Sequence, residues 1–164
     1  MKNCLFCRLI DSVDKEWESE HFYVIFDLSP VTPGHLVIIP KRHIVGFGDL
    51  NDIEWRELKR VIDRSVLYIE ESDLRGHYEK VLKRGEMSEK NKYFLKKAVE
   101  EVDIFGKPGG YNIGVNDGRV AGRTVDHLHI HIIPRYEGDS SEVVGGVRQV
   151  IKGRGDYRKR RSGS

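Results

Sequence analysis

Three histidines alternate with large apolar residues in the segment His127-Leu128-His129-Ile130-His131. Residues two apart on a β-strand project from the same face, so this spacing predicts a row of imidazoles roughly 6.5 to 7 Å apart. Leu128, Ile130 and Ile132 would then fill the core. Imidazole is both a nucleophile and a leaving group near neutral pH, so a histidine can carry a phosphoryl group transiently. The pattern therefore favours phosphoryl transfer.

Two other interpretations of the three histidines stay open. Imidazoles are zinc ligands, and a single ion might be held by the row, but a spacing of roughly 7 Å makes contact with all three difficult. Alternatively, the three are half-exposed residues of a sheet without a chemical role.

Cysteine usage and charge narrow the class of protein. The chain has two cysteines, Cys4 and Cys7, which form a Cys-x-x-Cys pair. Because residues 1–7 do not resemble a secretory leader, this pair indicates metal or redox chemistry before a disulfide.

Lys plus Arg (28) nearly balance Asp plus Glu (26), so the bulk charge does not indicate a nucleic-acid partner. No apolar run approaches the ~20 residues of a membrane helix, and we expect a cytoplasmic protein that has no membrane partner.

Periodicity predicts the elements that must position these residues. The alternation over 21–26 and the apolar run over 36–39 predict two strands of a hairpin. Asn51 and Glu54 resemble a capping box at the start of an amphipathic helix, and a second amphipathic stripe follows Ser88 after a polar stretch over 71–86. Further strands are predicted over 111–115 and over 126–133, the latter ended by Pro134. Segregated strands and helices indicate an α+β fold in which helices pack on an antiparallel sheet.

The chain is long enough for one domain, which we place at residues 1–151. Residues 152–164 are rich in Gly and Arg, have nothing to bury and are expected to form a disordered basic tail. Such a tail could touch nucleic acid, but a solvated terminus is the favoured interpretation.

Several blocks of the sequence, taken together and in order, resemble the histidine triad superfamily and its fold. They span Cys4 to about Tyr136, and the combination is far more specific than any one block. The blocks are Cys4-Leu5-Phe6-Cys7, residues 26–30, residues 33–43, Asn116-Asp117-Gly118, residues 121–125 and residues 127–135.

This resemblance implies roles for individual residues. His129 would attack the α-phosphorus, and His131 with His35 would hold phosphate oxygens as the other catalytic residues. Asp27 would bind the ribose hydroxyls. The remaining substrate-binding residues would be Leu5, Phe6 and Leu28 around the base and Asn116, Gly122, Arg123 and Thr124 around the phosphates.

The resemblance extends to a possible metal site and has one departure. Some family members carry a structural zinc, and Cys4, Cys7, His43 and His127 match its four ligands, so His127 would anchor the triad segment while His129 performs the chemistry. The alternative is a reduced thiol pair beside two unrelated histidines. Arg123 stands where the family commonly has Gln, and its charged, forked donor suits polyphosphate oxygens. No organic cofactor is expected.

The implied activity is hydrolysis of dinucleoside polyphosphates or related nucleoside phosphate conjugates at the α-phosphorus, through a nucleotidyl-histidine intermediate that releases a nucleoside monophosphate. Residues 132–139 and Gly145-Gly146-Val147-Arg148 look more like the polyphosphate hydrolases of the superfamily. Alternatives are a nucleoside phosphoramidase, a phosphorylase or nucleotidyltransferase, and a nucleotide-binding sensor with slow turnover. The substrate would carry adenine or guanine, nucleic acid is an unlikely partner, and family members of this size are typically homodimers. The resemblance assigns no role to residues 71–105.

Overall fold

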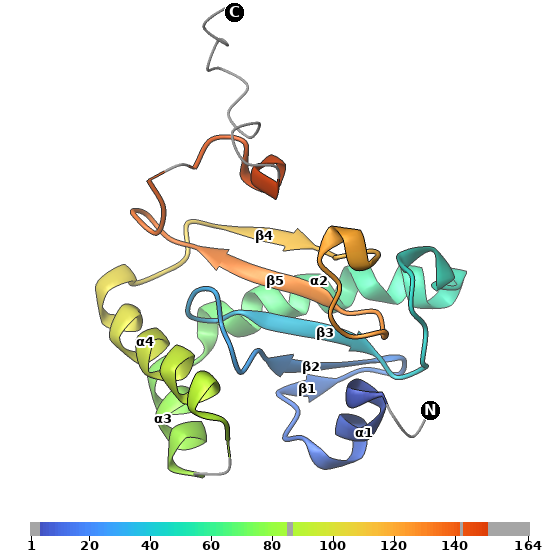
Figure 1. Cartoon of the computed structure of the whole chain (residues 1–164), viewed down its shortest axis with the longest axis horizontal. Helices are drawn as coiled ribbons and strands as arrows, with labels where there is room; N and C mark the ends of the chain where they lie inside the picture. The colour runs from blue at the N-terminus through green and yellow to red at the C-terminus, as the bar shows by residue number, and fades with distance from the viewer. Residues whose placement is uncertain (1–3, 85–86, 142, 151–164) are drawn as a thin grey trace, which may run out of the picture.

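A five-stranded antiparallel sheet in the order β1-β2-β3-β5-β4 forms the centre of the protein (Figure 1). The structure, a computed structural model, describes residues 4–84, 87–141 and 143–150. The expectation of an α+β fold with helices packed on an antiparallel sheet is confirmed. The described elements are α1 (Leu5–Ser12), β1 (Trp17–Glu18), β2 (Phe22–Phe26), β3 (Leu36–Pro40), α2 (Asp52–Glu71), α3 (Leu74–Lys83), α4 (Glu89–Phe105), β4 (Gly110–Gly114), β5 (Ile130–Arg135) and the short 3₁₀ turns Phe47–Asp49, Arg119–Ala121 and Gly146–Val150.

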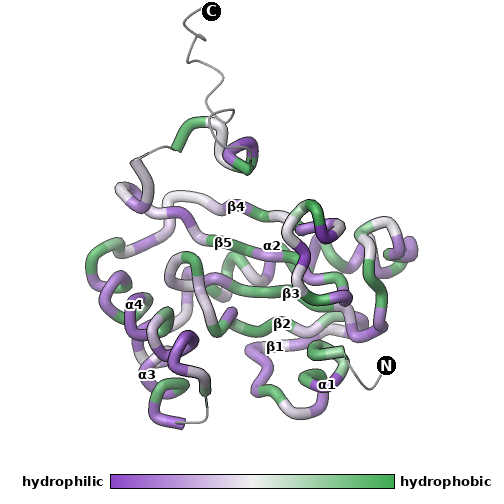
Figure 2. The backbone as a smooth tube through the Cα atoms, viewed as in Figure 1, coloured by the Kyte–Doolittle hydropathy of each residue, from purple (hydrophilic) through white to green (hydrophobic). Residues whose placement is uncertain are grey.

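The sheet is covered differently on its two faces. One face packs against α2, α3 and α4 through a large apolar cluster that includes Leu36, Ile132 and Tyr78. The other face packs against α1 through a smaller cluster centred on Phe6 and Val37. Strands β2 and β3 are therefore apolar on both sides, as their hydropathy shows (Figure 2). His131 pairs with Val37 across the β3–β5 ladder, so it lies on the α1 face.

Most predicted elements are present near their expected bounds. The predicted hairpin is formed by β2 and β3, with Phe26 opposite Leu36. The side chain of Asn51 accepts hydrogen bonds from the backbone of Ile53 and Glu54, and Glu54 accepts one from the Asn51 N–H, which completes the capping box of α2. The second amphipathic stripe, predicted after Ser88, is α4, and the Ser88 side chain caps this helix.

The strand predicted over 126–133 needs a correction. Strand β5 begins only at Ile130 and continues through Pro134 to Arg135, so His127 and His129 precede the strand. Proline is tolerated because the β3–β5 ladder ends at the pair Leu36–Ile132, which leaves no β3 partner for the missing N–H of Pro134. Leu128, Ile130 and Ile132 are buried, as predicted.

Two helices were not predicted. α1 begins directly after Cys4 and contains Cys7, and its eight residues are too few for a clear periodic signal. α3 falls in the stretch interpreted as a polar connection, because Leu74 and Tyr78 are its only buried residues in a largely charged segment. Within the described ranges, no helix combines the length and apolarity needed to cross a membrane. The tail predicted over 152–164 lies outside the described residues, as does Ile151 of the predicted domain.

Candidate functional site

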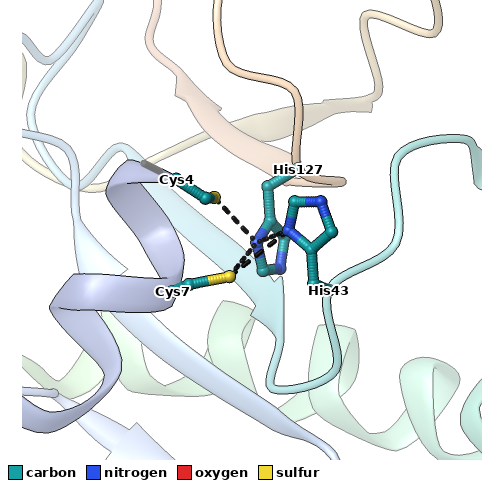
Figure 3. A group of neighbouring side chains, drawn as sticks. All are labelled: Cys4, Cys7, His43 and His127. Carbon is teal, nitrogen blue, oxygen red and sulfur yellow. Dashed lines mark hydrogen bonds between the residues drawn. The ribbon is translucent and has the colours of Figure 1, made fainter. Parts of the chain in front are cut away.

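Four potential metal ligands from distant parts of the sequence meet at one point (Figure 3). Cys4 and Cys7 lie at the start of α1, His43 follows β3, and His127 precedes β5. Their ligand atoms all lie within 4.8 Å of one another. The structure therefore brings together the four residues that the resemblance implied as zinc ligands.

The distances in this cluster match those around a tetrahedral zinc ion. Bonds of about 2.3 Å to sulfur and about 2.0 to 2.1 Å to nitrogen place tetrahedral ligands about 3.6 Å apart for a sulfur–nitrogen pair and about 3.3 Å apart for two nitrogens. Nδ1 of His127 lies 3.4 Å from Cys4 Sγ, 3.5 Å from Cys7 Sγ and 3.3 Å from His43 Nδ1. The donor set and its geometry both fit zinc.

The outer nitrogen of His127 is also fixed. Its Nε2 lies 2.9 Å from the carbonyl oxygen of Pro40, to which it donates as a neutral ring. This hydrogen bond leaves Nδ1 unprotonated, as a metal ligand must be. Burial lowers the pKa of His127, which also favours the neutral ring. His127 is thus oriented as a metal ligand would be, and it is linked to the end of β3.

His129 is buried beside Phe6, with 7% of its surface exposed and a ring-centre distance of 5.2 Å. Its Nδ1 lies 2.8 Å from the carbonyl oxygen of His127, the kind of backbone contact expected for a nucleophilic histidine. A neutral ring donating from Nδ1 keeps a lone pair on Nε2. The geometry therefore prepares His129 Nε2 for attack on an electrophile.

His35 and His131 form a second pair next to His129. His35 Nε2 lies 3.0 Å from His131 Nδ1, and the ring centres of His131 and His129 are 5.1 Å apart. The backbone N–H of Val31 donates to His35 Nδ1 over 3.3 Å. That donor, which the sequence did not indicate, makes His35 Nε2 the protonated nitrogen and His131 Nδ1 its acceptor, so His131 carries its proton on Nε2.

Both rings of this pair are neutral at pH 7. Burial lowers the pKa of His35 to about 4, with His131 acting in the same direction and Asp27 opposing them. Burial, followed by the proximity of His129, also lowers the pKa of His131. This pair of neutral rings leaves one N–H donor at His131 Nε2, and such a donor suits a phosphate oxygen.

The residues assigned to the nucleoside lie around the end of β2 and α1. Asp27 Oδ1 accepts a hydrogen bond from the Ser29 N–H, and its Oδ2 lies 3.8 Å from His35 Nδ1. Leu5 and Leu28 are exposed, as an open apolar surface for a base would be, whereas Phe6 is buried against the histidines. The structure thus places Phe6 beside the triad and leaves Leu5 and Leu28 accessible.

The predicted phosphate loop lies between β4 and β5. Asn116 and Gly122 are neighbours, because a Cβ on Gly122 would lie 3.8 Å from the Asn116 side chain. That distance is an ordinary contact, whereas the φ of Gly122, +97°, lies in the region that favours glycine. The requirement for glycine here is therefore conformational and comes from the backbone of the turn. Thr124 is exposed in the same loop.

Arg123 contacts protein groups. Its Nη1 donates to the Val45 carbonyl over 3.2 Å, and its guanidinium lies within ion-pair distance of Asp117 and Asp126. Its side chain is 15% exposed. Asp117 also accepts from the Phe47 N–H, so these residues join the phosphate loop to the segment that follows His43. In this arrangement Arg123 holds the loop, and direct contact with a polyphosphate stays a proposal.

Substituting Arg123 by Gln is expected to lower the free energy of unfolding by about 1 kcal/mol. The reason is that two carboxylates and a backbone carbonyl lose their partly buried guanidinium partner. Urea unfolding measures this loss. The matched control is Arg119→Gln, which removes an exposed partner of the same Asp126 and should have little effect. An Arg123→Gln protein as stable as wild type, with turnover lost only on long phosphate chains, would contradict the loop-holding role and favour direct phosphate binding.

A cavity of about 630 Å³ adjoins the histidine pair. His35, His131 and Asn116 line one part of it, and Val147 and Val150 from the Gly146–Val150 turn line another. Its volume suits the portion of a substrate beyond the reacting phosphorus. Residues 145–148 were noted only for their resemblance to polyphosphate hydrolases, and isolated valines carry no signal for the wall of a cavity.

A family model, the HIT domain, matches residues 14–138. A HIT-like protein of Methanocaldococcus jannaschii is 31% identical over 153 residues, covering 90% of this chain and 91% of that protein. An AP-4-A phosphorylase of Mycobacterium tuberculosis is 28% identical over 131 residues, and the match spans 78% of this chain but 50% of the phosphorylase. An adenosine 5′-monophosphoramidase of Saccharomyces cerevisiae is 26% identical over 149 residues, with 89% of this chain and 71% of that protein covered.

Solved structures resemble the fold described above. A HIT family protein from Bacillus subtilis has a TM-score of 0.57 and 28% identity, covering 84% of this chain and 76% of that one. A Zn-bound histidine triad family protein from Mycobacterium smegmatis has a TM-score of 0.55 and 25% identity, covering 87% of this chain and 81% of that one.

Proposed function

The chain belongs to the histidine triad (HIT) family, and from that membership and the site geometry we propose that it is a nucleotide hydrolase. In this proposal it cleaves dinucleoside polyphosphates or related nucleoside phosphate conjugates at the α-phosphorus and releases a nucleoside monophosphate. The observation that carries the proposal is His129, whose Nδ1 lies against the His127 carbonyl so that Nε2 is free to attack.

The reaction would proceed in two displacements. The lone pair of His129 Nε2 attacks the α-phosphorus, the bond to the leaving group breaks, and the leaving group takes a proton from the surrounding donors or water. Water then attacks the same phosphorus and gives up a proton, and the phosphorus–nitrogen bond breaks as its electron pair returns to His129. The N–H of His131, oriented through His35 and the Val31 backbone, would stabilise charge on the phosphate oxygens.

The acceptor distinguishes the second candidate from the first. A phosphorylase forms the same intermediate but transfers the nucleotidyl group to phosphate. One relative, about half of whose length is matched, is an AP-4-A phosphorylase. A phosphoramidase differs in its leaving group, which is an amine. The yeast relative is named as an adenosine 5′-monophosphoramidase. Both alternatives use the residues proposed above, as does a sensor that binds nucleotide and turns over slowly.

A substrate panel tests the proposal. Adenine and guanine dinucleoside polyphosphates and phosphoramidates are incubated with the full chain, first in water and then with added phosphate. We expect nucleoside monophosphate from the polyphosphates in water. A nucleoside diphosphate formed only when phosphate is present would identify a phosphorylase, and a reaction confined to phosphoramidates would identify a phosphoramidase. Tight binding with negligible product from every substrate would identify a sensor.

Four further assignments belong to the same proposal. The cluster Cys4, Cys7, His43 and His127 would hold a structural zinc that ties α1 to β5, and the chemistry of the reaction would stay with His129 and its neighbours. A homodimer and a cytoplasmic location remain expectations from the resemblance and the composition. Residues 1–151 would form the HIT domain and 152–164 a separate basic tail.

A further inference from the structure

One side chain of α3, Tyr78, contacts both ends of the loop that joins β2 to β3. The loop begins at Asp27 and ends at His35, and the Asp27 N–H donates a hydrogen bond of 2.9 Å to the His35 carbonyl. The hydroxyl of Tyr78, which is fully buried, accepts a hydrogen bond of 2.7 Å from the N–H of Gly34. Its ring packs 5.9 Å from that of Phe26. Tyr78 therefore holds the two residues that immediately precede Asp27 and His35.

The backbone of Gly34 has little room to move. Its φ of +83° lies in the left-handed region, and a Cβ at this position would lie 2.9 Å from Ile69 of α2 and 3.1 Å from Pro134 of β5. The Tyr78 hydroxyl is the acceptor for its N–H in this packed environment. Because a buried N–H without an acceptor is unfavourable, removal of that hydroxyl would favour a shift of Gly34 and of His35, which follows it.

The middle of the loop is held separately, from the end of β5. The Thr32 hydroxyl donates to the Pro134 carbonyl over 2.7 Å, and the Tyr136 hydroxyl donates to the Pro33 carbonyl over 2.8 Å. Both hydrogen bonds are buried, and neither involves α3. Loss of the contact from α3 would therefore affect the end of the loop and leave its middle attached.

The position of His35 determines where the protons of the histidine pair lie. Its Nδ1 accepts from the Val31 N–H over 3.3 Å, and its Nε2 lies 3.0 Å from His131 Nδ1. A neutral imidazole has one donor and one acceptor nitrogen, so these two contacts together select one tautomer of each ring. A shift of His35 would weaken both contacts and allow the proton of His131 to lie on Nδ1. In that tautomer the N–H donor proposed for the phosphate is lost.

From these contacts we propose that Tyr78 is a positioning residue of the active site, through which α3 fixes His35 by way of the Gly34 N–H. The proposal rests on the proposed function, because the roles of His35 and His131 belong to it. It gives a task to α3, which lies in the segment 71–105 to which the resemblance assigned none. Tyr78 contacts neither the substrate nor the reacting atoms in this role. It acts on turnover through the tautomers and orientation of the histidine pair.

The substitution Tyr78→Phe tests the proposal, because it removes the hydroxyl and keeps the ring. We expect kcat to fall about tenfold with KM changed by less than about twofold, since a misplaced donor weakens binding of the transition state more than that of the substrate. Steady-state kinetics on the substrate that the panel identifies measure both quantities. Proton–nitrogen correlation spectra of the imidazole rings should show His35 and His131 each protonated on Nε2 in the wild type, and a mixture of tautomers in the variant.

Tyr68→Phe is the matched control. The Tyr68 ring also packs on Phe26, at 6.1 Å, but its hydroxyl donates to Glu16 over 2.7 Å and not to the loop. This variant should keep the kcat and the tautomers of the wild type. An unchanged kcat or unchanged tautomers in Tyr78→Phe, or equal changes in Tyr68→Phe, would overturn the proposal.

The spectra separate this proposal from the proposed function, because they need no substrate. Failure of the wild type to turn over any member of the panel would count against the proposed function. The tautomers of His35 and His131 in the two variants would still decide whether Tyr78 positions His35.

Discussion

Replacing His129 by alanine is expected to lower turnover at least ~10⁴-fold while nucleotide binding changes only a few-fold. The reason is that the substitution removes the Nε2 lone pair that forms the intermediate, and the other groups cannot replace a nucleophile. Asp27, Leu28 and the His35–His131 pair would still contact the nucleotide. Single-turnover kinetics and calorimetry with the product nucleotide measure the two quantities separately.

His21→Ala is the control for loss of a histidine. His21 pairs with Glu57 of α2 and lies outside the proposed site, so its replacement should leave turnover unchanged apart from any effect on folding. Near-normal turnover in His129→Ala would contradict the assigned nucleophile. Equal loss of binding and turnover would show that the substitution disrupts the site as a whole.

The double substitution Cys4→Ser and Cys7→Ser is expected to remove about one zinc per chain and to lower the melting temperature by at least ~10 °C. Structural zinc contributes directly to folding free energy, and for a domain of this size each kcal/mol shifts the melting temperature by roughly 2 to 4 °C. The cluster also joins α1 to His43 and His127, so its loss loosens three segments at once.

Elemental analysis and thermal unfolding of freshly prepared protein, before any chelator, measure these effects. At temperatures well below unfolding the variant should keep part of its activity, because the loss is one of stability first. Absence of zinc from the wild-type protein, or an unchanged zinc content in the double variant, would refute the structural-zinc proposal.

The elements predicted correctly were those whose sequences carry a local signal. The hairpin of β2 and β3 follows from the alternation over 21–26 and the apolar run over 36–39, and α2 follows from the Asn51–Glu54 capping box and its helical periodicity. The start of β5 was misplaced because the His127–His131 alternation begins before the strand does. At that point the side-chain cluster around His127 and the hydrogen bond from the Leu128 N–H to the Ile44 carbonyl replace strand pairing.

The site was predictable only in its residue types. The spacing favoured phosphoryl transfer, and the resemblance named His129 as the nucleophile. The resemblance also grouped Cys4, Cys7, His43 and His127, which the structure brings together. The Val31 N–H that orients His35 is a backbone group with no sequence signal. The partners of Arg123 and the attachment of α3 through Tyr78 depend on tertiary packing between distant segments, which local periodicity does not report.

The central claim is that His129 carries the nucleotide during turnover, and trapping the intermediate tests it most directly. Enzyme is mixed with a dinucleoside polyphosphate and quenched within milliseconds in alkali or denaturant, since a phosphorus–nitrogen bond is labile to acid. Intact-mass and peptide analysis should show one nucleoside monophosphoryl group on the peptide that contains His129, with fragmentation placing it on that ring. A label that maps reproducibly to His131, or steady turnover with no covalent adduct at any time point, would contradict the account.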